Sequence, residues 1–266
     1  MKSINELMNL NGRRALITGA NGHIGHQIAS TIAEMGGDLI LVDLPGSNYD
    51  NLLENLSSSF NINVECIDCN LEDKKSREQM VHEILKQDKP LNILCNNAAF
   101  VGTSGLKGWA VTFEEQSIET WRRALEVNLT AVFDLSKGLS DKLKECGNAS
   151  IINIGSIAAH QGGVDNPGYV SSKSGIVGLT KALANDYYSA NIRVNSISPG
   201  YFKSPMTEKS YKSKKRKKNI SSRLIINRWG EAKDLFGLVE YLMSEKASYV
   251  TGQDFVIDGG WLAKGL

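Results

Sequence analysis

Cysteine, net charge and long apolar runs are all scarce in this 266-residue chain, and each scarcity excludes a class of protein. No apolar stretch approaches the ~20 residues that a membrane-spanning helix needs. Residues 1–11 mix lysine, glutamate and asparagine with isolated apolar residues, which is not the pattern of a secretory signal. The formal net charge is +1, so the composition gives no reason to expect nucleic acid or a membrane as a partner.

The four cysteines include one C-x-x-C pair, Cys66 and Cys69, a spacing found in metal and redox sites. The pair lies in an apolar run where strand alternation sends residues three apart to opposite faces. No second pair completes a zinc site. We therefore predict buried thiols in a cytoplasmic protein, and no bound metal.

Hydrophobic residues (41%) and charged residues (22%) are present in ordinary proportions for a globular protein with a substantial core. Short apolar runs predict strands at Arg14–Thr18, Leu39–Val42, Asn63–Ile67, Asn92–Cys95, Ser150–Ile154, Arg193–Ile197 and Asp254–Ile257. Helical periodicity between them predicts helices at Gly25–Gly36, Lys74–Gln87, Ile118–Glu145, Val170–Tyr188 and Glu231–Ser244. This alternation predicts an α/β fold: a Rossmann-like doubly wound parallel sheet of about seven strands with helices on both faces. We expect one domain over residues 1–266, with substrate loops at about 100–117 and 201–228.

A glycine-rich turn follows the first predicted strand, in Thr18-Gly-Ala-Asn-Gly-His-Ile-Gly25, and leads directly into an amphipathic helix. Glycines permit a tight turn and let backbone N–H groups approach a pyrophosphate at the positive end of that helix. Such a string alone is a weak signal, but its place between a strand and a helix strengthens it. The predicted cofactor-binding residues here are Gly19, Asn21, Gly22, His23, Ile24 and Gly25.

Asp43 ends the second predicted strand, 18 residues beyond Gly25. A carboxylate at about this distance accepts hydrogen bonds from the adenosine ribose hydroxyls in dinucleotide-binding folds. It would repel the 2′-phosphate of NADP(H), and no Arg or Lys adjoins it, so we predict NAD(H) as the cofactor. A turn aspartate is the alternative, because Asp43-Leu-Pro-Gly46 also suits a turn.

Tyr169 and Lys173 are four residues apart in a predicted helix and so face the same side of it. Ser156 precedes Tyr169 by thirteen positions and follows the end of the fifth predicted strand. A Tyr-x-x-x-Lys pair is common by chance, and a packed tyrosine beside a surface lysine is the alternative for an isolated occurrence.

The chain resembles the short-chain dehydrogenase/reductase family over nearly its whole length. The motifs that carry the resemblance occur in the family's order: the Thr18–Gly25 turn, Asp43, Asn96-Asn-Ala-Ala99, Asn128 in Val-Asn-Leu, Ser156, Tyr169 with Lys173, Pro199-Gly200, and Asp258-Gly-Gly260. The resemblance implies a catalytic tetrad of Asn128, Ser156, Tyr169 and Lys173. Further implied cofactor contacts are Asn70 and Leu71 at the adenine, Asn97 and Ala98 on the adenosine ribose side, and Pro199, Gly200, Phe202 and Ser204 around the nicotinamide.

The chemistry of such a family accounts for these residue types. When hydride leaves a carbon, its hydroxyl proton must leave too, so Tyr169 is predicted to be the acid/base. A free tyrosine has a pKa of ~10, which the Lys173 cation and an oxidised nicotinamide would lower. Ser156 is predicted to hold the substrate oxygen, and Asn128 to act through its backbone and water.

The sequence departs from the family pattern at three places. His23 stands where the short branch usually has a third glycine, so we expect its side chain to point outward; a phosphate contact is the alternative. Ala99 replaces a commoner glycine. Asn70 replaces a frequent aspartate, yet its amide oxygen can still accept a hydrogen bond from the adenine amine.

The substrate side is less determined by the sequence. Residues 100–127 form a long segment with small polar groups and Trp109, which suggests a polar pocket with His160, Gln161 and Asn166 in which Trp109 stacks on a sugar. A surface loop with one packed tryptophan is the alternative. The basic run Lys212–Lys218 lies where the family places a substrate lid; a solvated face is the first interpretation, and attraction of an anionic substrate is the second.

These observations predict an NAD(H)-dependent oxidoreductase that interconverts a secondary alcohol and a carbonyl on a sugar-like or other polar substrate. A 3-oxoacyl-[acyl-carrier-protein] reductase is the alternative enzyme, and a non-catalytic nucleotide-sensing protein is the alternative from another class. The resemblance also implies a homotetramer or dimer formed through the two long predicted helices beside the active site.

Overall fold

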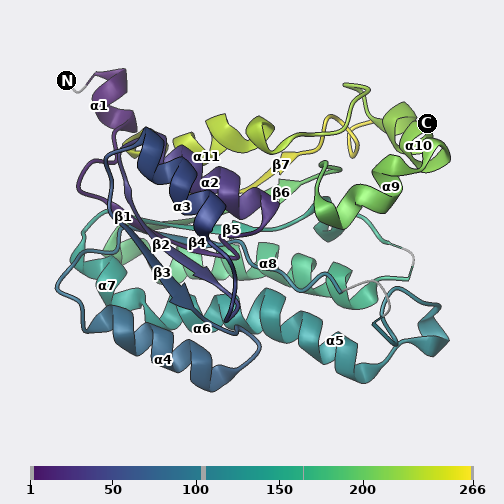
Figure 1. The fold of residues 1–266 in the computed structure, drawn as a ribbon, viewed down its shortest axis with the longest axis horizontal. Coiled ribbons are helices and arrows are strands. Elements are labelled where there is room, and N and C mark those ends of the chain that lie inside the picture. Colours follow the sequence, from purple (N-terminus) through teal and green to yellow (C-terminus); the bar gives the residue numbers. More distant parts are fainter. Residues whose placement is uncertain (1–2, 103–105, 164, 265–266) are drawn as a thin grey trace.

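A parallel sheet of seven strands, in the order β3-β2-β1-β4-β5-β6-β7, forms the centre of the computed structural model, which describes residues 3–102, 106–163 and 165–264 (Figure 1). The strands are β1 (Arg14–Thr18), β2 (Asp38–Asp43), β3 (Val64–Asp68), β4 (Ile93–Asn96), β5 (Ala149–Ile154), β6 (Ile192–Pro199) and β7 (Asp254–Ile257). The chain runs outward from β1 to β3 and then returns to the other side of β1 with β4. The predicted doubly wound sheet is confirmed, and each predicted strand agrees to within two residues.

Helices cover both faces of the sheet, as predicted (Figure 1). One face is covered by α2 (His23–Glu34), α3 (Asp50–Ser59) and α11 (Phe236–Met243), whose Ile28, Leu52 and Val239 belong to one buried cluster. The other face is covered by α4 (Lys74–Leu85), α5 (Ile118–Leu125), α6 (Ala131–Gly138), α7 (Ser140–Glu145) and α8 (Pro167–Asp186). Met80 and Leu183 belong to the cluster beneath this second layer. The central strands β1, β4, β5 and β6 are buried at every position, which accounts for their many apolar residues.

The predicted helix Ile118–Glu145 is wrong as one continuous element. A π-helical segment, Glu126–Thr130, follows α5, and α6 ends at Gly138 before α7 begins at Ser140. Gly138 lies against Val81 of α4, where an added Cβ would be 3.1 Å from the Val81 side chain. Close packing on α4 therefore favours glycine where a helix would prefer almost any other residue.

Four α-helices of the described residues were not predicted from the sequence: α1 (Ile4–Met8), α3, and the pair α9 (Glu208–Lys212) and α10 (Lys214–Arg223). The last two lie within residues 201–228, which we call the lid segment, so the basic run is helical. The C-terminal helix is also shorter than predicted, because Ala232–Leu235 is a 3₁₀ turn ahead of α11.

Cys66 corrects the prediction of buried thiols. It is exposed, whereas Cys69 and Cys95 are buried. The reason is the position of β3 at the edge of the sheet, where only Ile67 of that strand is buried.

The helix prediction over Val170–Tyr188 agrees with α8 to within three residues.

Candidate active site

The carboxyl ends of the parallel strands meet at one edge of the sheet, and the predicted site residues follow them. The glycine turn follows β1, Asp43 ends β2, Asn97 follows β4, Ser156 follows β5 and Pro199 ends β6. This edge includes the switch point between β1 and β4, where folds of this type bind ligands.

The turn after β1 requires glycine at two positions. Gly19 has φ +64°, and a Cβ there would lie 2.8 Å from the Cα of Ala98. A Cβ on Gly25 would collide with the carbonyl oxygen of Gly19. These contacts hold the backbone of the turn against the segment that follows β4.

The exposed side of the turn, at the start of α2, fits a dinucleotide pyrophosphate. The N-cap residue of α2, Gly22, supplies no side-chain hydrogen bond, so the first N–H groups of this helix keep their positive field. A cavity of about 370 Å³ lies beside it, lined by Asn21, Gly22 and His23 from the turn and by Pro205 from the start of the lid segment. His23 is exposed, which agrees with the outward orientation expected for it.

Asp43 lies directly against the turn. Its Oδ2 accepts a hydrogen bond from the Asn21 N–H at 2.8 Å, and its Oδ1 accepts from the Leu44 N–H at 2.8 Å. The carboxylate thus lies beside the glycine turn, and it makes the turn bonds that the alternative interpretation predicts. The ribose contact stays a prediction.

Asn97 and Thr18 hold the turn from inside. The Asn97 side-chain amide donates to the carbonyl oxygens of Thr18 and Gly19, both at 2.9 Å. The Thr18 hydroxyl accepts from the N–H groups of Asn97 and Ala98, both at 3.1 Å. The side-chain amide of Asn97, a residue that the family resemblance places at the cofactor, therefore donates within the protein. Sequence reasoning assigned no role to Thr18, whose only signal is its place before the glycines.

Tyr169 and Lys173 lie one turn apart near the start of α8, and both face the end of β5. The Ser156 side chain lies close enough to the Tyr169 phenol to act on its pKa as a hydrogen-bonding group. The Lys173 Nζ donates to the Ile154 carbonyl oxygen at 2.7 Å and lies 5.9 Å from the centroid of the Tyr169 ring. The structure therefore brings together three members of the predicted tetrad.

Burial favours the neutral form of both groups. It raises the pKa of Tyr169, against the opposing effect of the Ser156 hydrogen bond. It lowers the pKa of Lys173, which is 3% exposed, to about 8. The lysine cation was expected to lower the pKa of the phenol, but here burial outweighs any such effect.

Asn128 is held in the π-helical segment and is 1% exposed. Its side-chain amide donates to the Phe100 carbonyl at 3.1 Å and to the Ser172 hydroxyl at 3.0 Å, and its Oδ1 accepts from the Phe100 N–H at 2.6 Å. The side chain thus fixes the start of the substrate loop, which leaves the backbone for the relay that was predicted. A π-helical turn is rare and is often found at functional sites.

The residues implied for the nicotinamide lie at the base of the lid segment. Gly200 passes so close to β7 that an added Cβ would be 2.7 Å from the Asp258 Cα. Phe202 is buried and pairs with Gly230, which ties the two ends of the lid segment together. Ser204 caps the 3₁₀ turn Pro205–Thr207, with its hydroxyl accepting from the Thr207 N–H at 3.4 Å.

The predicted residues on the adenine side lie between β3 and α4. The Asn70 Oδ1 accepts from the Glu72 N–H at 3.1 Å, so one of its acceptor positions is in use. The Leu71 side chain is buried, and its carbonyl oxygen accepts from Arg77.

The hypothesis of a polar pocket around Trp109 is wrong for two of its members. His160 Nε2 pairs with the Asp254 carboxylate at 2.6 Å, and Gln161 Oε1 accepts from the Trp261 indole at 2.8 Å. Trp109 donates to the Val101 carbonyl at 2.8 Å and packs edge-on against Phe100, as the packed-tryptophan alternative has it. Residues 103–105 of this loop lie outside the described part of the chain.

None of the helices within residues 3–102, 106–163 and 165–264 combines the length and the apolar character that a membrane span requires. The same part of the chain holds no group of three or more His, Cys, Asp or Glu side chains placed to bind a metal ion.

Comparison with known proteins extends these observations. A family model described as enoyl-(acyl carrier protein) reductase matches residues 19–262. The 2-dehydro-3-deoxy-D-gluconate 5-dehydrogenase of Bacillus subtilis is 32% identical over 99% of this chain and 100% of its own. The 3-oxoacyl-[acyl-carrier-protein] reductase of Thermotoga maritima is 31% identical over 95% of this chain and 99% of its own.

A solved structure from Beutenbergia cavernae, provisionally assigned as an NAD(P)-dependent gluconate 5-dehydrogenase, has NADP bound at low occupancy. It is 30% identical to this chain, with a TM-score of 0.88 over 97% of this chain and 100% of that one.

Proposed function

Since the chain belongs to the short-chain dehydrogenase/reductase family, we propose that it interconverts a secondary alcohol and a carbonyl with NAD(H) on a polyhydroxylated, sugar-like substrate. The observation that carries this proposal is the placement of Tyr169 beside Ser156 and one helical turn from Lys173, at the same sheet edge as the glycine turn. The hydroxylated substrate is supported by the name of the Bacillus subtilis relative.

In this mechanism Ser156 holds the substrate oxygen, and Tyr169 exchanges a proton with it. When bound, the nicotinamide supplies or accepts the hydride, and its oxidised form adds a positive charge that favours the phenolate. Because burial raises the pKa of Tyr169, the phenol is protonated at neutral pH and ready to donate to a carbonyl. Lys173 stabilises the negative charge left on the phenol, and the backbone around Asn128 carries protons to solvent.

NAD(H) is proposed from the position of Asp43 at the glycine turn, where its charge opposes a 2′-phosphate. The Beutenbergia cavernae structure holds NADP, so the cofactor is a point for experiment. We further propose a single catalytic domain, a cytoplasmic location, and a homotetramer or dimer formed through α5, α6 and α8.

A 3-oxoacyl-[acyl-carrier-protein] reductase is the second candidate, supported by the Thermotoga maritima relative and by the description of the family model. A nucleotide-sensing protein without turnover is the third. The assembled Ser156, Tyr169 and Lys173 favour an enzyme over it.

A coupled NAD⁺/NADH screen of polyols, aldonic acids and nucleotide sugars against 3-oxoacyl thioesters tests the proposal. We expect turnover on a hydroxylated substrate, reduced at least 1,000-fold by Tyr169→Phe with NADH binding nearly unchanged, since only the acid/base is removed. Preference for a thioester would favour the second candidate. Full activity of the Tyr169→Phe enzyme would contradict the mechanism.

A further inference from the structure

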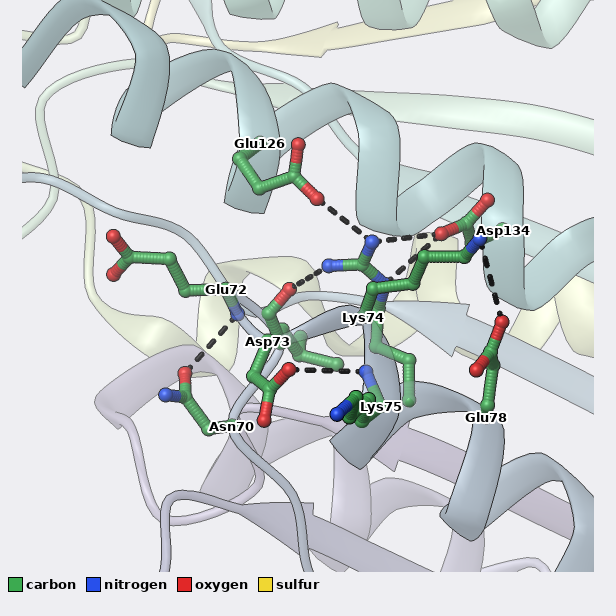
Figure 2. Close-up of polar contacts among 10 residues, drawn as sticks. Asn70, Glu72, Asp73, Lys74, Lys75, Glu78, Glu126 and Asp134 are labelled. Carbon is green, nitrogen blue, oxygen red and sulfur yellow. Dashed lines mark hydrogen bonds and ion pairs between the residues drawn. The ribbon is translucent and has the colours of Figure 1, made fainter. Parts of the chain in front are cut away.

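Arg77 is a buried cation in α4 that the proposed mechanism does not use. Its side chain is 3% exposed. The guanidinium donates to the Leu71 carbonyl oxygen, to Glu126 at 2.7 Å and to Asp134 at 2.8 and 3.0 Å. Figure 2 shows Glu126 and Asp134 converging on one cationic group, with Asn70 and Glu72 on its other side.

The three partners of Arg77 belong to three different parts of the molecule. Leu71 lies in the segment after β3 that is proposed to hold the adenine. Glu126 is the first residue of the π-helical segment, two positions before Asn128, and Asp134 lies eight positions after Glu126, in α6. One guanidinium therefore joins the adenine side of the cofactor site to the segment that carries Asn128.

A second contact runs parallel to the first. Arg123 of α5 forms a bidentate pair with Glu72, at 2.7 and 3.1 Å, and its guanidinium lies 4.9 Å from the centroid of the Phe100 ring. The backbone N–H and C=O of Phe100 are the groups that hold the Asn128 side chain. Residues 70–72 thus reach Asn128 from both sides, through Arg77 and through Arg123.

The geometry of Arg77 suits a residue that transmits a movement of the Leu71 carbonyl to Glu126 and Asp134, and not one that only stabilises the fold. The guanidinium is planar, and its donors have fixed directions, so a shift of the Leu71 carbonyl changes the bonds to both carboxylates. Burial opposes the charge of Arg77, yet its two carboxylates outweigh this effect and raise its pKa. The group is therefore always charged, and it is held too tightly to move independently of its partners.

We propose that Arg77 is a positioning residue that couples cofactor binding at Asn70-Leu71 to the placement of Asn128. This inference rests on the proposed function for the identity of the cofactor site. It goes beyond that function by assigning a role to a side chain that contacts neither substrate nor cofactor.

The two carboxylates provide a matched pair of variants. Glu126 and Asp134 are 34% and 33% exposed, and each pairs with the same Nη2 of Arg77. Either substitution by alanine leaves Arg77 with one carboxylate, so both variants should fold. Asp134→Ala also removes the bond from Nε and should lose at least as much stability as Glu126→Ala. Glu126→Ala should lower kcat about 10-fold, and Asp134→Ala less than about 2-fold, because only Glu126 lies in the segment of Asn128. Glu126→Gln, which keeps an acceptor oxygen, should recover most of the kcat.

Hydrogen exchange gives a readout that does not need turnover. NADH should slow exchange of the amides of residues 126–130 in the wild-type protein, and Arg77→Lys should abolish this protection, because a lysine cannot span the three partners. Asp134→Ala should retain it. These measurements use the intact chain with NADH alone.

Equal losses of kcat in Glu126→Ala and Asp134→Ala, or protection that survives Arg77→Lys, would overturn the coupling and leave Arg77 a stabilising residue only. Protection without turnover on any substrate would sustain the coupling and reject the proposed function. A wild-type protein that binds neither NADH nor NADPH would overturn both.

Discussion

Tyr169 and Lys173 are affected by burial in opposite directions on the pH scale, because one is neutral and the other charged when protonated. Burial raises the pKa of the phenol and lowers that of the ammonium to about 8. A buried lysine that stays charged at pH 7 costs stability, since water solvates the ammonium better than the protein does. Lys173, which the proposed mechanism uses, therefore lowers the stability of the folded protein at pH 7.

Lys173→Met should make the protein more stable at pH 7 while removing its activity. The pKa of Lys173 falls from 10.5 to about 8 on folding, which corresponds to about 3 kcal/mol against the charged form. The variant also loses the hydrogen bond from Nζ to the Ile154 carbonyl, which costs ~1 kcal/mol. We therefore expect a net gain of roughly 2 kcal/mol in the free energy of unfolding.

The pH dependence gives the control. Between pH 8 and 10.5 the unfolded chain binds more protons at this lysine than the folded chain, so the wild-type protein gains stability as the pH rises. The difference in the free energy of unfolding between wild type and Lys173→Met, measured in urea, should therefore shrink from pH 7 to pH 10. A constant difference at both pH values would refute the assignment.

Asp43→Asn should shift the cofactor preference towards NADP(H). The single amide oxygen of asparagine can accept from the N–H of Asn21 or from that of Leu44, which now bond to different carboxylate oxygens, so one turn bond is kept while the charge is lost. We expect the ratio of kcat/KM for NADPH over NADH to rise about 10-fold, the effect of removing one repulsive charge. Asp68→Asn, at the neighbouring position of β3, is the control and should leave the ratio unchanged. An unaltered ratio in Asp43→Asn would show that Asp43 is only a turn residue.

Sequence reasoning placed residues well where spacing along one element decides their position. Tyr169 and Lys173 meet because they are four apart on a helix. Sequence reasoning did not predict the contacts of His160 and Gln161, because their partners Asp254 and Trp261 come from the far end of the chain. A hydrogen-bonding side chain goes to the partner that the tertiary fold supplies, which spacing does not reveal.

Among the elements, strands were predicted more accurately than helices. A strand buried on both faces is a short run rich in apolar residues, and such a run ends sharply at the following turn. Helices without an amphipathic pattern were missed: α10 is almost entirely polar, has no buried residue and shows no apolar period. The π-helical break after α5 was hidden because apolar residues continue through it.

The α10 helix concentrates cations at its positive end, with Lys214 to Lys217 in its first turn and no acidic residue there. This arrangement is unfavourable for the helix dipole. If it attracts an anionic substrate, Lys214→Gln with Lys215→Gln should raise KM about 10-fold at 10 mM salt and far less at 1 M, where the Debye length is only ~3 Å.

The matched control for this prediction is Lys86→Gln with Lys89→Gln, which removes two exposed lysines near the amino end of β4. Its KM should stay within ~2-fold of wild type at either salt concentration. A KM for the α10 variant that does not depend on salt would identify that surface as solvated only.

At the scale of the whole molecule, the alternation of strands and helices predicted the class of fold and the number of strands. The order of the strands was not predicted, because nothing local tells whether β4 returns to β1 or adds beyond β3. The reversal creates the site, since it opens the sheet edge at the switch point.

Phe133 tests the proposed assembly. It lies on α6 and is 45% exposed, a large apolar side chain on the helical face proposed for subunit contact. Phe133→Glu should reduce the molar mass in light scattering to half or a quarter, because a charge would be buried without a partner. Tyr249→Glu, at a fully exposed tyrosine outside α5, α6 and α8, should not change it. A wild-type protein already at the mass of one chain would contradict the assembly.

The pairing of β7 with β6 has a consequence for biosynthesis. β7 is formed by residues 254–257, so it emerges from the ribosome after every other strand. Until then the β6 edge has unpaired backbone groups, an open template for another nascent chain. Chaperone capture or aggregation during translation should therefore be concentrated in the interval between release of residue 199 and release of residue 257.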